Sequence, residues 1–221
     1  MSKILTIGYT TEGSTDVRFL GNIIQRTFEE LIFESQSYNS VAPPANLTCT
    51  AKKFSQKILK LATLYSSLDV ICVHCDADGR SSKKVMNNKI NPAFQLVENS
   101  DKGKMCKNLV AVIPVQMTEA WMLADFDLLK DEIGTRMSNR ELELPVRINQ
   151  IESLSNPKEK IINALRIAQA SKPRRRRKIK ISELYTPLSQ KLSIKELREL
   201  PSFRAFEENA REALKRLNYL Y

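Results

Sequence analysis

Carboxylate side chains stand directly after three short apolar stretches that lie far apart in this sequence. These carboxylates are Glu12, Asp76, Asp78 and Glu119. Clustered carboxylates repel one another, and two charges about 4 Å apart cost about 4 kcal/mol at an effective dielectric of 20. A hard divalent cation removes that penalty, and ligands that offer only oxygen suit Mg²⁺ or Mn²⁺. If the fold brings these side chains together, they predict a metal centre.

The pair Asp76 and Asp78 forms an Asp-x-Asp motif, which places two carboxylates on the same side of an extended chain. Gly79 follows and lets the chain turn sharply away. Plain turn formation is the alternative interpretation of this motif. For Asp16 and Glu119 the alternative is a favourable interaction with a helix dipole, because both fall in the first turn of an expected helix.

The elements that must position these carboxylates can be read from apolar patterning. Strands are expected at residues 3–10, 69–75 and 109–115. Amphipathic helices are expected at residues 17–32 and 54–68, and another begins after Thr118. Residues 36–46 contain two prolines and are expected to form a loop, and residues 47–50 are a candidate for a further short strand.

The alternation of these strands and helices predicts an α/β fold with a mainly parallel sheet flanked by helices. Sheets of this kind bind ligands at the carboxyl ends of their strands. The acidic residues fall at those ends. This convergence is the observation on which the functional interpretation depends.

The composition changes after about residue 131, where strand patterns stop and helical patterns take over. Helices are expected at residues 157–170, 194–200 and 203–217. We therefore divide the chain into an α/β metal-binding domain, residues 1–130, and a basic helical extension, residues 131–221.

A dense run of positive charge lies inside that extension. Its basic residues are Lys172, Arg174, Arg175, Arg176, Arg177, Lys178 and Lys180. The run is either a solvated segment or a grip for nucleic-acid phosphates, and we favour the grip. The whole chain carries a formal net charge of +10, which favours a phosphate-rich partner over a merely soluble basic surface.

A zinc site at Cys72, His74 and Cys75 is rejected on geometry. These residues lie in an expected strand, where side chains three apart point to opposite faces. His74 is the only histidine in the chain, and it is expected to be a buried strand residue outside the chemistry. The four cysteines are expected to be free thiols, as is usual for a protein of the cytoplasm. No stretch of the sequence is apolar over a length that predicts a transmembrane helix.

The residues after the first two strands resemble the Toprim superfamily, a fold shared by topoisomerases, bacterial primases, small RNA maturases and OLD-type nucleases. The matching motifs are Glu12-Gly13 and Asp76-Ala-Asp78-Gly79. The form Glu12-Gly-Ser-Thr-Asp16 is most similar to the OLD-type branch, and this implies that Asp16 joins Glu12 at the metal site. The resemblance covers about the first 125 residues.

A looser resemblance covers nearly all of the chain. Residues 114–125, the segment Asn156-Pro-Lys and the basic helical tail are similar to a group of small stand-alone prokaryotic Toprim-like proteins of unknown function. Nucleotide-sugar glycosyltransferases also use Asp-x-Asp, but there an earlier strand and nucleotide-binding segment precede the Gly-Ser-Thr-Asp element. Haloacid dehalogenase phosphatases place Thr or Val two residues after the second Asp, where this chain has Arg80.

The Toprim resemblance implies a Mg²⁺- or Mn²⁺-dependent phosphodiester hydrolase that acts on DNA or RNA, with a possible place in a prokaryotic defence system. The expected catalytic residues are Glu12, Asp76 and Asp78. The expected metal ligands are Glu12, Asp16, Asp76, Asp78 and Glu119. Glu12 is either a ligand or the general base.

The alternative function is a module that binds nucleic acid or a partner ATPase without cleaving. OLD-type Toprim domains are coupled to ATPases, and this chain has no Gly-x-x-x-x-Gly-Lys-Ser/Thr loop of its own. A separate ATPase partner and a homo-oligomer are compatible with either function.

Overall fold

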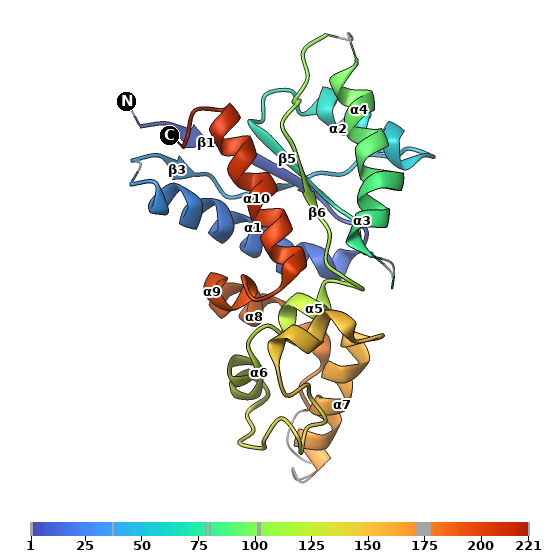
Figure 1. The fold of residues 1–221 in the computed structure, drawn as a ribbon, viewed down its shortest axis with the longest axis vertical. Helices are drawn as coiled ribbons and strands as arrows, with labels where there is room; N and C mark the ends of the chain where they lie inside the picture. Colours follow the sequence, from blue (N-terminus) through green and yellow to red (C-terminus); the bar gives the residue numbers. More distant parts are fainter. Residues whose placement is uncertain are drawn as a thin grey trace.

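A computed structural model describes residues 2–36, 38–77, 79, 81–100, 103–170 and 178–220. A parallel sheet with helices on both faces makes up one part of the molecule, and helices alone make up the other (Figure 1). The predicted α/β class, with a mainly parallel sheet flanked by helices, is confirmed. No helix of the described part is long and apolar enough to cross a membrane.

Four parallel strands form the main sheet in the order β4-β2-β5-β6. They are β2 (Ile7–Thr10), β4 (Ala45–Asn46), β5 (Val70–His74) and β6 (Leu109–Val112). A second parallel pair joins β1 (Ile4–Leu5) to β3 (Ser40–Val41). A single residue, Thr6, separates β1 from β2. Its N–H and hydroxyl both donate to the Asp69 carboxylate, at 2.7 and 2.8 Å, and this interrupts the strand.

The segment between the first two helices differs from the prediction. The expected loop at residues 36–46 contains β3 and β4, and β4 ends just before the candidate strand at residues 47–50. Pro43 and Pro44 separate β3 from β4, since proline has no N–H to offer a neighbouring strand. Two-residue strands also carry no apolar alternation that a sequence could reveal.

Helices of the first half cover opposite faces of the sheet. Helix α1 (Ser14–Glu34) packs on the face that carries Val70 and Cys72, and α2 (Phe54–Leu64) packs on the face that carries Ile71 and Val73. Because β4 and β5 flank β2 on opposite sides, the strand order reverses between β2 and β5. The crevice at the carboxyl ends of such strands is where open α/β sheets bind ligands.

Between β5 and β6 the chain forms α3 (Ser82–Val85), the π-helical segment η1 (Met86–Ile90) and α4 (Asn91–Glu98). After β6 come α5 (Glu119–Met122), α6 (Phe126–Ile133), the 3₁₀ segment η2 (Ile148–Ser153) and α7 (Pro157–Ala170). The chain continues through the 3₁₀ segment η3 (Ile181–Glu183), α8 (Tyr185–Lys191), α9 (Ile194–Leu197) and α10 (Pro201–Arg216).

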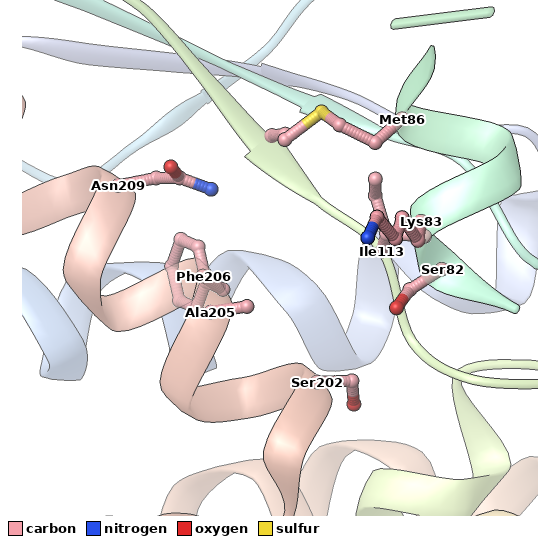
Figure 2. Close-up of a pocket in the computed structure, with 9 residues that line it drawn as sticks. Ser82, Lys83, Met86, Ile113, Ser202, Ala205, Phe206 and Asn209 are labelled. Atoms are coloured by element: carbon pink, nitrogen blue, oxygen red, sulfur yellow. The ribbon is translucent and has the colours of Figure 1, made fainter. Parts of the chain in front are cut away.

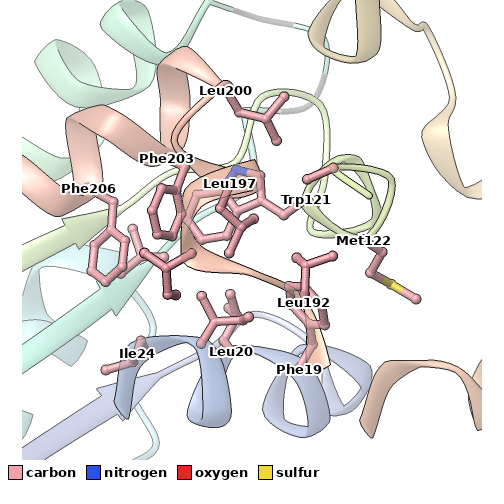
Figure 3. Packing of buried hydrophobic residues seen from close by; sticks show 14 of the residues in the cluster. Phe19, Leu20, Ile24, Trp121, Met122, Leu192, Leu197, Leu200, Phe203 and Phe206 are labelled. Carbon is pink, nitrogen blue, oxygen red and sulfur yellow. The ribbon is translucent and has the colours of Figure 1, made fainter. Parts of the chain in front are cut away.

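The C-terminal helix α10 returns to the sheet and packs beside β6 (Figure 1). Its Phe203 and Phe206 lie against Trp121, with ring centroids 5.2 and 5.9 Å away (Figure 3). Trp121 Nε1 also donates to Ser202 Oγ at 2.7 Å. One buried apolar cluster thus includes residues from both sides of position 130. The division into residues 1–130 and 131–221 stays a prediction, and it falls within a shared core.

The packing of Phe203 and Phe206 against Trp121 predicts that α10 contributes to the stability of the whole fold. Changing Phe206 to Ala removes a fully buried ring and should lower the free energy of unfolding by about 3–5 kcal/mol. The matched control is Phe33→Ala, whose side chain is 79% exposed and whose loss should cost less than about 0.5 kcal/mol. Urea unfolding measures both. Equal effects for the two variants would show that α10 is a detachable appendage.

Candidate metal centre

Asp16, His74 and Asp76 converge at the crevice between β2 and β5. One ligand atom from each lies within 4.8 Å of the other two. Asp16 stands in the first turn of α1, His74 ends β5, and Asp76 follows two residues later. Helix α1, which follows β2, and the end of β5 therefore deliver these groups to one point.

The start of α1 fixes the position of Asp16. The Gly13 N–H donates to Asp16 Oδ2 at 3.0 Å, and this bond closes the first turn of the helix. A Cβ atom at position 13 would lie 2.9 Å from the same oxygen, so a larger residue there would displace the Asp16 carboxylate. The buried carboxylate therefore caps the helix from a position beside Asp76. The capping role and the predicted role in the metal site are compatible.

His74 is buried, as predicted, but it lies within the site. Its Nε2 is 3.0 Å from Asp76 Oδ1 and 3.4 Å from Thr118 Oγ1. Its Nδ1 is buried without a hydrogen-bond partner among the described residues. The exclusion of His74 from the chemistry overlooked one signal, which is that residues two apart on a strand share a face. Asp76 and His74 have that spacing.

The surroundings of Asp76 raise the pKa of its carboxyl group. Burial raises its pKa, and the charges of Asp16 and Glu12 raise it further, while the hydrogen bond with His74 opposes them. The pKa of Asp76 therefore lies above its ordinary value. The fold holds this carboxylate where its ionised form is disfavoured, which is the situation that a bound cation relieves.

Glu12 lies at the edge of the cluster, where its charge still acts on Asp76. Its Oε1 accepts a hydrogen bond from Lys89 Nζ at 2.6 Å. Burial tends to raise the pKa of Glu12, but the hydrogen bond and charge of Lys89 outweigh burial and bring it below the ordinary value. Glu12 is thus a charged carboxylate that lies near the cluster but is not one of the three residues whose ligand atoms lie within 4.8 Å of one another.

Glu119 does not join the cluster. Glu119 is buried, and its Oε1 accepts a hydrogen bond from the Tyr185 hydroxyl. The same oxygen forms an ion pair with Lys158 Nζ at 3.1 Å. Burial and Glu119 together raise the pKa of Tyr185, which also hydrogen-bonds to Thr15. Glu119 therefore ties α5 to α7 and α8.

Several predicted site residues fall outside the described residues. They are Asp78, Lys172, Arg174, Arg175, Arg176 and Arg177. Lys178 and Lys180 are described, and both are exposed. The nucleic-acid role of this basic segment stays a prediction.

The geometric argument against zinc holds in the structure. Cys72 packs in the cluster on the α1 face, and Cys75 packs in the cluster on the α2 face. Burial raises the pKa of Cys75 to about 11, so this side chain is a thiol at neutral pH. Both residues are free cysteines.

A pocket of about 190 Å³ lies beside β6, between α3 and α10. Apolar side chains form much of its lining, with Ser82, Lys83 and Asn209 adding polar groups (Figure 2). Asp16, His74 and Asp76 are not among its lining residues. The pocket and the converging ligand groups are therefore separate features of this end of the sheet.

The fold and the cluster define an α/β protein with an acidic, histidine-containing crevice at a strand-order reversal. The chain belongs to a family described as "Domain of unknown function (DUF4276)", whose model matches residues 11–209. That range contains the whole cluster and most of α10. No curated protein and no solved structure matches the chain.

The raised pKa of Asp76 predicts a pH-dependent effect of Asp76→Asn in the presence of EDTA. A carboxyl whose pKa is higher in the folded state stabilises the fold at low pH, and that stability is lost as pH rises through the folded-state pKa. The amide avoids this loss, so the variant should melt above the wild type near neutral pH. The gap should close below about pH 4.

Thermal melting across that pH range measures the difference. A variant that melts below the wild type near neutral pH would show that the His74–Asp76 interaction outweighs the repulsion among the carboxylates.

Proposed function

We propose that this protein is a divalent-metal-dependent phosphodiester hydrolase that acts on nucleic acid. The observation that carries the proposal is the convergence of Asp16, His74 and Asp76 at the ligand-binding crevice of the sheet. The Toprim resemblance of Glu12-Gly13 and of the Asp-x-Asp motif supports the same chemistry. The net charge of +10 supports a polyanionic substrate.

The donor set fits a small divalent ion. Neighbouring ligands around an octahedral ion lie about 3 Å apart when each is about 2.1 Å from the metal. His74 Nε2 and Asp76 Oδ1 are separated by 3.0 Å. Asp16, which is buried, and Asp76, which is partly buried, supply the negative charge. An imidazole suits transition-metal ions better than Mg²⁺. Of the two metals expected from the sequence, we therefore favour Mn²⁺, held by Asp16, His74 and Asp76.

A bound ion would supply Lewis acidity and an activated water. The protein's own residues have separate tasks. The capping bond from Gly13 orients the Asp16 carboxylate. With an ion bound, His74 Nε2 would bind it in place of its present contact with Asp76. Glu12 stands beside them in its charged form, which is the form that accepts a proton from water. Its position at the edge of the cluster favours the role of general base over that of ligand.

Metal binding is tested by thermal stability. A ligand that binds only the folded protein stabilises it by about 2.7 kcal/mol at a hundredfold excess over Kd. Mn²⁺ should therefore raise the melting temperature relative to EDTA, and His74→Gln and Asp16→Asn should each reduce the shift. Glu132→Gln is the control, because this carboxylate pairs with Lys191 away from the cluster. An undiminished shift in both cluster variants would refute the ligand assignment.

Catalysis is tested with Glu12→Gln, which keeps the shape of the side chain and removes its charge. The purified wild type should cleave plasmid, single-stranded DNA or structured RNA with Mn²⁺, alone or with an ATPase encoded beside it. The variant should lose at least about a hundredfold in rate, in keeping with loss of a general base, while its nucleic-acid binding is retained.

Two outcomes would contradict these assignments. A wild type that binds but never cleaves under any of these conditions is a binding module, and the hydrolase proposal is then wrong. A Glu12→Gln variant that cleaves at the wild-type rate would leave the activity standing and remove Glu12 from the mechanism.

A further inference from the structure

Two lysines from different helical segments converge on the turn that carries Glu12. Lys89 Nζ lies 2.6 Å from Glu12 Oε1, and Lys57 Nζ lies 3.4 Å from the carbonyl oxygen of Thr11. Lys89 belongs to η1 on the chain between β5 and β6, whereas Lys57 belongs to α2. The turn between β2 and α1 is therefore flanked by two ammonium groups.

The structure holds Lys89 in place from two sides. Its Nζ lies 4.9 Å from the centroid of the Phe54 ring, in addition to its contact with Glu12. The segment η1 is a π-helical interruption between α3 and α4, and such interruptions occur frequently at functional sites. The Lys89 side chain is still 38% exposed, so a ligand from solvent can reach it.

Stability alone gives little reason for this arrangement. An ion pair between two side chains that are each about a third exposed contributes little to folding, because water and salt screen it. The pair instead keeps one cation extended beside the cluster of Asp16, His74 and Asp76. A lysine ammonium in such a position is a point charge suited to a phosphate oxygen.

We propose that Lys89 and Lys57 bind a backbone phosphate of a nucleic-acid strand at the edge of the metal centre. The inference deepens the proposed function, on which it rests for the identity of the ligand. A phosphate oxygen takes the place of the Glu12 carboxylate as the partner of Lys89. Arrival of the strand then frees Glu12 from its ion pair, so that substrate binding and availability of the base are linked.

The test measures binding of a fluorescein-labelled oligothymidylate of about fifteen nucleotides in EDTA, so that cleavage plays no part. The logarithm of the binding constant is followed against the logarithm of salt concentration for the wild type, Lys89→Met, Lys57→Met and the double variant. Each lost phosphate contact on a single strand should flatten this slope by about 0.7. The double variant should show about twice the change of either single one.

Two further variants separate charge from structure. Lys215→Met removes another exposed lysine that pairs with a carboxylate, Glu212 at 2.7 Å, and it should leave the slope unchanged. Lys89→Arg keeps the positive charge and should retain the wild-type slope. Melting temperatures identify any variant that fails to fold, and the arginine variant then decides the role of the charge.

The proposal is overturned if the wild type does not bind the oligonucleotide, or if the double variant has the same salt slope as the wild type and Lys215→Met. Its failure is distinguishable from failure of the proposed function. Flattened slopes in a protein that never cleaves would support the phosphate site and refute the hydrolase. Cleavage with unchanged slopes would support the hydrolase and refute this role for Lys89 and Lys57.

Discussion

The closeness of the Asp16 and Asp76 carboxylates is the constraint on which the rest of the site depends. Two charges about 5 Å apart repel by roughly 3 kcal/mol at an effective dielectric of 20, and the fold must supply something that opposes this. The first turn of α1 anchors one carboxylate through Gly13, and His74 anchors the other. Burial, and to a lesser degree the charges of Asp16 and Glu12, still raise the pKa of Asp76, and a bound cation would favour its ionised form.

The helical second half of the chain contributes to the same constraint. Helix α8 packs along α1, and its Tyr185 links Glu119 to Thr15 in the first turn of α1. Lys158 of α7 neutralises Glu119 from the other side. These contacts hold the N-terminus of α1, and with it Asp16, against the end of β5. The contacts around Asp16 therefore come from both sides of the predicted boundary at residue 130.

The sequence was sufficient to predict β2, β5 and β6 from their apolar, strand-forming runs, and α1, α2 and α7 from their apolar period. That Asp16 lies near Asp76 was expected only from the resemblance to OLD-type Toprim proteins, because the strand-end argument concerned Glu12, Asp76, Asp78 and Glu119. The sequence did not predict α8, whose seven residues include Pro187 and are too few for a period, or the exclusion of Glu119, which depends on partners 39 and 66 residues away. His74 was set aside as a buried strand residue, although its spacing of two residues from Asp76 was a local sign that the two side chains share a face.

The central claim is that His74, with Asp16 and Asp76, holds a divalent ion. His74 is the only histidine in the chain, so labelling histidine with ¹⁵N places the isotope on one imidazole ring. Pulsed electron paramagnetic resonance of bound Mn²⁺ then reports directly on that ring. The account predicts a nitrogen coupling to Mn²⁺ that changes on ¹⁵N labelling and disappears in His74→Gln. A spectrum of bound Mn²⁺ without any histidine nitrogen coupling would contradict it.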